Sequence, residues 1–520
     1  MNQSVTKTNW FTNLFPKTKH DWKMYIMKSI PIIIGEILFC LNGFLDNFMV
    51  SHLDQGIDAL TYANTWTGLI YIIFFAIQGI AAMYVGQYYG RKMYHKVNQI
   101  MNIRFWMNVV FTLFFALPVW ISPTSMIKAV SGQGISTIAL DQARLYLILI
   151  SFSWLITCYN FNTNMQLNET GHSNYAFVGA CLTLVSNATI NATLLYGFHL
   201  PAWGAAVGSI CAALVCLLSD SLFTYFKDRP IFMNPLKIFM IKKDIAKQVL
   251  IKVPAMLINI LAMATVPMRM IFWARAYPEN SVGEAWMHIS GATILGLVES
   301  LAAIASAVIG VCSSNVSYFV ATKLGQEKYD EAQRISQELK GFHTICGIFI
   351  SVIMIGVVYA IGYLPVTSKG VALKIQEELT TNGVAKEIIS QKVDLAVSTF
   401  RSIFIKCCWT FIGFNALWCW FYTSLALIRS GGKSNLASIA LLIGQGTMAG
   451  WHAIICFVIV PHYPDVMTLQ ISYFLLFSYD FIRWIMYETI QMKCNWKRNI
   501  TLHNEEDQFL KEEQEIKLNN

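Results

Sequence analysis

The stretch SIPIIIGEILFCLNGFLDNFMVSHL, residues 29–53, is apolar and long enough to cross a bilayer, yet it carries Glu36, Asn42 and Asp46. A carboxylate near the centre of a bilayer costs roughly 2.5–3.5 kcal/mol on insertion scales, so an acid that is kept there indicates a function. Asn42 and Asp46 are four residues apart, which places them on one face of a helix. The stretch therefore predicts a membrane-spanning helix with a functional acidic face.

The rest of the 520-residue sequence has the same apolar character. Hydrophobic residues make up 55% and charged residues 13% of it, about half the charged fraction of a usual soluble protein. Apolar runs of spanning length recur along the chain, which indicates a polytopic membrane protein. The net charge of +8 lies in short loops between these runs, so we interpret it as topogenic and not as a nucleic-acid surface.

We expect an all-α membrane protein with twelve transmembrane helices. The expected spans lie at about 29–53, 60–89, 105–121, 143–165, 175–196, 202–226, 254–275, 286–320, 342–364, 402–428, 436–460 and 470–490, with a polar insert at 365–401. The predicted organisation is an N-terminal tail (1–28), an N-terminal six-helix lobe (29–226), a basic linker (227–252), a C-terminal six-helix lobe (253–492) and a C-terminal tail (493–520).

The positions of lysine and arginine fix the expected orientation. They gather near the termini and at the ends of the even-numbered spans, and Arg104 belongs to this set. The opposite loops are nearly free of them, apart from the insert at 365–401. By the positive-inside rule, both tails and the linker are expected in the cytoplasm of a multi-pass protein of the cell (plasma) membrane.

Two short motifs recur in the same order in both halves. The first has the spacing G-x-x-x-Y-x-x-[VA]-x-x-I and begins at Gly90 and again at Gly325, an offset of 235. The second, G-[HK]-S-N, begins at Gly171 and Gly432, an offset of 261. The repetition predicts two six-helix lobes related as a parallel internal repeat around a central cavity that opens alternately to each side.

Taken together, these motifs resemble the multidrug and toxic compound extrusion (MATE) family. Pro31 followed by Asp46 resembles the first helix of that family, and the Gly90, Gly171 and Gly432 turns resemble its exits and polar turns. The segment WGAAVGS at 203–209 resembles its G-A-A-x-A-T motif in the sixth helix. The resemblance covers about residues 25–495 and implies a secondary transporter, not an enzyme.

In one branch of that family a cation site joins the first-helix Asp to an N-x-x-x-D pair on the fifth helix and a Thr on the sixth. The resemblance assigns these roles to Asp46, Asn187, Asn191 and Ser209, with Asn42 on the same face as Asp46. Asn191 stands where the family has its second acid, so the pocket is expected to hold one negative charge. Both H⁺ and Na⁺ remain possible as the coupling ion. The alternative for the two asparagines is that they only form hydrogen bonds between helices and bind no ion.

Further charged residues inside the expected spans are candidates for a second-lobe acid or for substrate contacts: Glu299, Glu36, Asp480 and Arg269. Glu36 lies one turn inside the first span, and Glu299 is the best candidate for an acid in the second lobe. Asp480 and Arg483 are three residues apart, which favours a local ion pair. Asp220, near the inner end of the sixth span, is expected to reach the interface.

The sequence lacks the motifs of several other functions. It contains no phosphate loop, no HExxH and no G-x-S-x-G, and its twelve cysteines form no CxxC pair or metal-ligand set. We therefore expect no enzyme activity, no metal and no cofactor beyond H⁺ or Na⁺ as the coupling ion.

Abundant aromatic residues and methionine suit amphipathic organic cations. The prediction is a monomeric secondary active efflux transporter in the lipid bilayer that exports such small molecules in exchange for H⁺ or Na⁺. The alternative is a flippase or exporter of a lipid-linked or polar precursor on a related two-lobed fold, which we expect to have a more basic cavity.

Overall fold

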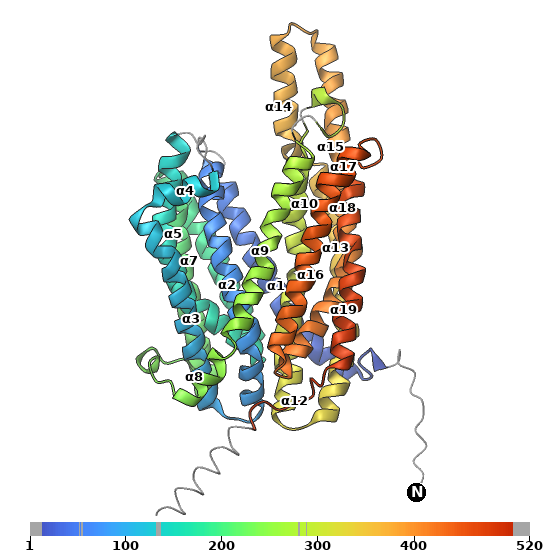
Figure 1. Cartoon of the computed structure of the whole chain (residues 1–520). Coiled ribbons are helices and arrows are strands. Elements are labelled where there is room, and N and C mark those ends of the chain that lie inside the picture. The colour runs from blue at the N-terminus through green and yellow to red at the C-terminus, as the bar shows by residue number, and fades with distance from the viewer. Residues whose placement is uncertain are drawn as a thin grey trace, which may run out of the picture.

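The computed structural model describes residues 13–50, 53, 56–131, 137–278, 281–287 and 289–502. Within these residues the regular structure is entirely helical. The long helices run side by side along one axis (Figure 1), and eleven of those described are long and apolar enough to cross a membrane. The twelfth expected span is two shorter helices, α18 (Leu469–Ser478) and α19 (Asp480–Lys493), separated at Tyr479. The prediction of an all-α polytopic membrane protein is confirmed.

The N-terminal lobe contains the helices that precede the linker. They are α1 (Lys19–Met49), α2 (Gly56–Gly90), α3 (Tyr94–Ile121), α4 (Pro123–Ser131), α5 (Thr137–Glu169), α6 (Ser173–Asn191) with a π-helical turn (Ala192–Gly197), and α7 (Trp203–Lys227). The linker holds two 3₁₀ turns (Arg229–Ile231 and Pro235–Lys237) and the short amphipathic helix α8 (Lys243–Leu250).

The C-terminal lobe repeats this arrangement beside the first lobe. Its helices are α9 (Val253–Ala276), a 3₁₀ turn (Ala285–Met287), α10 (Gly291–Ala305), α11 (Ala307–Asn315) with a π-helical turn (Val316–Ala321), α12 (Thr322–Gly325), α13 (Tyr329–Gly362), α14 (Pro365–Thr381), α15 (Lys386–Ser430), α16 (Ser434–Ile454) with a π-helical turn (Ile455–Ile459), α17 (Val460–His462), α18 and α19.

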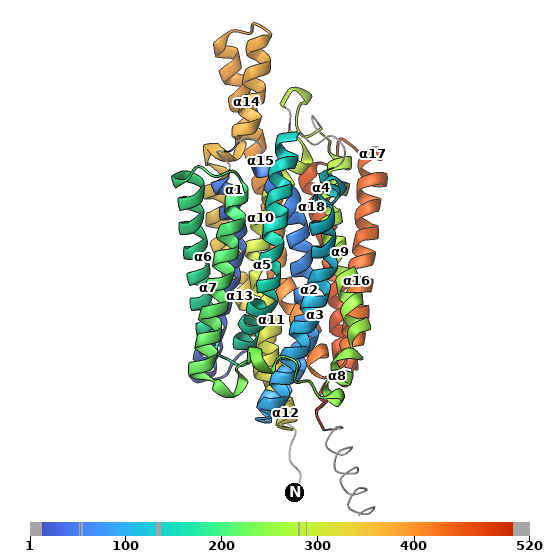
Figure 2. The same cartoon turned by 90° about the vertical axis from the view of Figure 1, so that its left-hand side faces the viewer.

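The molecule has two unlike ends. The polar insert forms a helical hairpin of α14 and the first part of α15, which projects beyond the other helices and defines the hairpin end (Figures 1 and 2). Gly383, with φ of +69°, makes the turn between the two helices, a conformation that glycine adopts without strain. The opposite end, which carries α8 and α12, is called the basic end.

The internal repeat is visible in the backbone itself. Lys92 and Glu327, at the offset of 235, both follow the repeated glycine with positive φ, 60° and 62°. Gly171 and Gly432, at the offset of 261, have φ of 83° and 82°. Left-handed conformations at a non-glycine residue are uncommon, so their recurrence at the same place in both lobes confirms the parallel repeat.

The two lobes meet at the basic end through these repeated glycines. A Cβ atom on Gly90 would lie 2.2 Å from the carbonyl oxygen of Thr322, and a Cβ on Gly325 would lie 2.1 Å from that of Gln87. Gln87 and Thr322 are themselves at the offset of 235, so the contact between α2 and α12 is symmetric. Only glycine permits the two backbones to approach this closely.

Residues 494–502, called the C-terminal strap, extend this contact across the basic end. The backbone N–H of Ile500 donates to Oε1 of Gln87 at 2.9 Å, and Nε2 of Gln87 donates to the carbonyl of Ser430 at 2.8 Å. Nδ2 of Asn499 donates to the carbonyl of Gly325 at 3.2 Å. The strap thereby joins α2 of the first lobe to α12 and α15 of the second.

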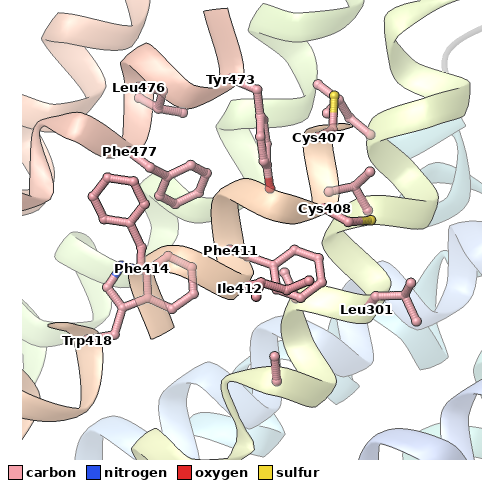
Figure 3. Close-up of a cluster of buried hydrophobic side chains, with 14 of the residues drawn as sticks. Leu301, Cys407, Cys408, Phe411, Ile412, Phe414, Trp418, Tyr473, Leu476 and Phe477 are labelled. Carbon is pink, nitrogen blue, oxygen red and sulfur yellow. The ribbon is translucent and has the colours of Figure 1, made fainter. Parts of the chain in front are cut away.

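The long helix α15 forms the centre of the C-terminal lobe. Its aromatic side chains pack against α18 in a buried hydrophobic cluster (Figure 3). The ring centroids of Phe414 and Phe477 lie 6.4 Å apart, and those of Trp418 and Phe477 lie 5.4 Å apart. This cluster is mainly apolar packing.

Arg104 is not a topogenic charge, so that prediction is wrong. Helix α3 begins at Tyr94, earlier than expected, and carries Arg104 into the lobe, where its side chain is 1% exposed. Its Nη1 lies 2.9 Å from Oε1 of Glu169, which is also buried. A buried charge needs a partner and hydrogen bonds, and this pair supplies both.

Candidate functional site

The N-terminal lobe encloses a cavity of about 420 Å³ lined by α1, α2, α5, α6 and α7. This volume lies in the range of about 300–1,000 Å³ that is usual for small-molecule sites. Glu36 and Asp46 line it, and no lysine or arginine occurs among the described residues of its lining. The cavity is thus acidic and belongs to one lobe.

Asp46 lies near the hairpin end of α1 and is 5% exposed. Its Oδ1 accepts hydrogen bonds of 2.7 Å from Nδ2 of Asn187 and from Nδ2 of Asn191. Its Oδ2 accepts a hydrogen bond of 3.2 Å from the hydroxyl of Ser209. Nδ2 of Asn187 also donates to Oδ1 of Asn42 at 2.9 Å. The structure brings together all five residues that the resemblance and the helical spacing grouped.

The geometry of α6 and α7 explains this grouping. Asn187 and Asn191 are four residues apart, so both point from one face of α6 toward α1, and both are fully buried. Asn191 is the last residue of α6 before the π-helical turn, a feature often found at functional sites. Gly208 permits the close approach of α7, because a Cβ there would lie 1.8 Å from Oδ1 of Asn191.

Two buried acceptors beside Asp46 have no hydrogen-bond partner within the described residues: Oδ1 of Asn187 and Oδ1 of Asn191. A buried polar atom without a partner costs about 1–3 kcal/mol. Two amide oxygens next to a carboxylate are the kind of ligands that hard cations take. The donors around Asp46 stabilise its carboxylate, and the unpartnered oxygens offer ligands, so the residues fit either a proton or a small monovalent cation.

Glu36 occupies the middle of α1, since the helix begins at Lys19 and not at residue 29 as expected. It lines the cavity and faces α11, where a Cβ on Gly310 would lie 3.4 Å from its Cδ. Among the described residues, no hydrogen-bond donor or basic side chain contacts it. Its carboxylate is therefore available to a ligand.

Aromatic side chains form the wall of the cavity near Glu36. The rings of Phe39 and Tyr71 meet edge to face at 4.8 Å between centroids, and those of Phe75 and Phe161 do so at 5.2 Å. All four residues line the cavity. Their faces offer apolar contact and cation–π attraction to a ligand whose charge lies near Glu36.

The remaining candidates lie in the C-terminal lobe, away from Asp46. Glu299 accepts a hydrogen bond of 3.0 Å from the hydroxyl of Tyr473 and does not line the cavity. Asp480 pairs with Arg483, whose Nε donates to it at 2.6 Å, as the spacing predicted. Arg269 contacts Oε1 of Gln445 at 3.5 Å.

The burial of two polar groups in the N-terminal lobe was not predicted from the sequence. One is the pair of Arg104 and Glu169, which Nε2 of Gln78 joins with a hydrogen bond of 3.0 Å to Glu169. The other is Asp220, which is fully buried, so the expectation that it reaches the interface is wrong. Residues flanking an apolar run give no signal that distinguishes a buried acid from an interfacial one.

Comparison with known proteins agrees with this architecture. The MatE family model matches residues 31–193, which include Asp46, Asn187 and Asn191. No curated protein is similar enough in sequence to match.

Solved structures share the fold over nearly the whole chain. A MATE transporter in complex with MaL6 is similar with a TM-score of 0.69 at 15% identity, covering 94% of this chain and 98% of that one. A point mutant of the Vibrio cholerae MATE transporter VcmN has a TM-score of 0.68 at 12% identity, with 94% and 100% covered.

A MOP superfamily transporter from Pyrococcus furiosus has a TM-score of 0.68 at 14% identity, covering 94% of this chain and 100% of that one. The binding pocket of that transporter is described as having reversed polarity. These likenesses establish that the chain has the fold of MATE transporters. The match to the MatE family model covers part of the N-terminal lobe, where the cavity and Asp46 lie.

Proposed function

We propose that the protein is a monomeric antiporter of the cell membrane that exports amphipathic organic cations in exchange for H⁺ or Na⁺ by alternating access. The observation that carries this proposal is the cavity lining, which combines Glu36 and Asp46 with aromatic rings and contains no lysine or arginine among its described residues. Such a lining attracts cations and repels anions. It also counts against the alternative of a flippase or exporter of a lipid-linked or polar precursor, for which we expect a more basic cavity.

Asp46 is the proposed coupling residue. Its carboxylate is held by three donors from α6 and α7, so binding a cation there changes the hydrogen bonds that join α1 to both helices. Exchange of one coupling ion for one monovalent substrate is electroneutral, so the concentration gradient of the coupling ion supplies the energy, about 1.4 kcal/mol for each tenfold difference. A single acid is therefore sufficient to couple a tenfold ion gradient to about tenfold export.

Glu36 is the proposed contact for the positive group of the substrate. It is ten residues from Asp46 on the same helix, about 15 Å along the axis. Asp46 already accepts three hydrogen bonds, whereas Glu36 accepts none from the described residues. The two acids can thus bind substrate and coupling ion at separate places in one cavity.

The proposed orientation places the basic end in the cytoplasm, with both termini on that side. The positive-inside rule supports it. The glycine contacts of Gly90 and Gly325 and the C-terminal strap join the lobes at this end, so the described conformation is held together on the proposed cytoplasmic side. Opening toward the cytoplasm requires these contacts to separate.

Two matched dyes test this function in proteoliposomes, one cationic and one a neutral analogue of the same shape, under separate H⁺ and Na⁺ gradients. We expect driven export of the cationic dye and, in Glu36→Gln, about ten- to hundredfold weaker binding of that dye alone, since a hydrogen bond to a charged group contributes about 1.5–3 kcal/mol. Glu36→Asp, which keeps the charge, is the matched control. Equal handling of both dyes by the wild type contradicts the proposal.

A further inference from the structure

Most deeply buried acids of this protein are paired with a cation. Glu169 contacts Arg104, Asp480 contacts Arg483, and Glu338 contacts Arg334. Asp220, on α7, is 0% exposed and has no lysine, arginine or histidine within 4.0 Å among the described residues. An isolated buried carboxylate costs several kcal/mol, so its retention without a counter-ion requires an explanation.

The surroundings of Asp220 are polar but neutral. Its Oδ2 accepts a hydrogen bond of 2.9 Å from Nδ2 of Asn164 on α5 and lies 3.6 Å from Sγ of Cys216 on its own helix. Its Oδ1 has no partner within the described chain. That oxygen faces Gly179 of α6, where a Cβ would lie only 2.1 Å from it. The described groups that face Asp220 from α5, α6 and α7 therefore carry no charge.

Asp220 lies directly behind the wall of the cavity. Both of its side-chain partners, Asn164 and Cys216, line that cavity, as does Thr183. Asp220 follows Ser209, the partner of Asp46, by eleven residues on α7, about 16 Å closer to the basic end. The cavity thus has Asp46 near one end and Asp220 behind its lining toward the other.

We propose that Asp220 is a second proton-binding site, at the inner end of the cavity and reached from it past Asn164 and Cys216. A proton taken from cavity water forms an O–H bond at Oδ1 and removes the cost of the buried charge. When the proton returns to water, the amide of Asn164 and the thiol of Cys216 donate to the carboxylate that remains. The groups that contact the carboxylate are an amide N–H₂ and a thiol, which are donors, whereas a metal cation requires several further oxygen ligands.

Infrared spectroscopy of the full chain in lipid nanodiscs tests the site without any transport. At neutral pH we expect a protonated-carboxyl C=O band that is lost in Asp220→Asn and retained in Asp46→Asn. Asp244→Asn removes an exposed acid from α8 and serves as the matched control that leaves the band in place. In D₂O the band is expected to shift within the time of buffer exchange, because the site is reached from the cavity.

A spectrum of Asp220→Asn that superimposes on the wild type overturns the proposal, as does a band that resists exchange in D₂O. Asn164→Leu provides a second route if Asp220→Asn fails to fold. It keeps the acid and removes its hydrogen bond, so the same band is expected to move, and an unmoved band contradicts the assignment. The readout is independent of export, so a protein that exports no cation but shows the band refutes only the proposed function.

Discussion

Asn191 donates a hydrogen bond of 2.7 Å to Oδ1 of Asp46 at the position where the family pattern has a second acid. The substitution replaces a negative charge by a neutral donor. It leaves one carboxylate in the site, held by three donors and flanked by two amide oxygens without partners among the described residues. The charge that the site can carry inward is therefore expected to be one per cycle.

Asn191→Asp is expected to increase the dependence of export on Na⁺. Two carboxylates at the distance of the present hydrogen bond repel each other, and a bound cation relieves this repulsion. Rates of dye efflux under a Na⁺ gradient and under a H⁺ gradient measure the change. Asn98→Asp, which adds the same charge near the start of α3 at the basic end, is the control. An unchanged ratio of the two rates in Asn191→Asp counts against a charge-limited site.

Gly208→Ala is expected to reduce driven export by about five- to 150-fold. The added methyl group would lie 1.8 Å from Oδ1 of Asn191, and overpacking of this kind costs about 1–3 kcal/mol. Gly197→Ala, where nothing lies within 4 Å of the new atom, is the matched control. Initial efflux rates from proteoliposomes provide the comparison. Equal rates in the two variants would show that the Asn191 contact is dispensable.

Gly325→Ala is expected to separate the lobes at the basic end. The new Cβ would lie 2.1 Å from the carbonyl of Gln87, so α12 must move away from α2. Spin labels at the exposed His95 and Lys328 report the distance between the lobes, which should increase. Gly356→Ala, with open space around the new atom, is the control. A distance distribution equal to that of the wild type contradicts the role of this contact.

Deletion of the chain after Lys493 is expected to shift the same distance in the same direction. The deletion removes the hydrogen bonds that Asn499 and Ile500 make to Gly325 and Gln87. Each of these hydrogen bonds contributes about 0.5–1.5 kcal/mol to the contact between the lobes at the basic end. A chain that ends after Leu502 keeps the strap and serves as the control. If both chains give the same distances, the strap does not hold the lobes together.

Arg104→Gln is expected to destabilise the protein by about 3–5 kcal/mol, because it leaves the carboxylate of Glu169 buried without its cation. The double variant Arg104→Met with Glu169→Leu removes both charges and should recover much of this loss. Thermal unfolding in detergent measures the effect, with the exposed Lys237→Gln as control. An unchanged melting temperature in Arg104→Gln would show that water reaches Glu169.

The sequence predicted the neighbours of Asp46 because helical spacing preserves them. Asn187 and Asn191 share one face of α6 however the helices pack. The family pattern then added Asp46 on α1 and Ser209 on α7 to the same site. The pair of Arg104 and Glu169 was not predictable in this way, since its two residues lie 65 apart and both flank apolar runs. Position along a span likewise indicated interfacial exposure for Asp220, whereas packing between α5, α6 and α7 buries it.

The cavity was also harder to predict than its residues. A repeat of two lobes favoured a central cavity shared by acids of both lobes, with Glu299 opposite Asp46. The structure places Glu299 beside Tyr473 in the C-terminal lobe and the described cavity among α1, α2, α5, α6 and α7. Whether space between the helices stays open depends on how the side chains pack and which rotamers they adopt. The spacing of residues in the sequence does not determine this packing.

Asp46 is the proposed link between cation entry and export, and Asp46→Asn removes the charge on which this link depends. Asparagine keeps the size of the side chain and removes its charge, so the protein is expected to fold and to bind the cationic dye through Glu36. Uphill efflux of that dye from proteoliposomes, driven by an imposed H⁺ or Na⁺ gradient, is the measurement. This efflux is expected to fall to the rate of protein-free vesicles, whereas efflux at the wild-type rate would refute the coupling role of Asp46.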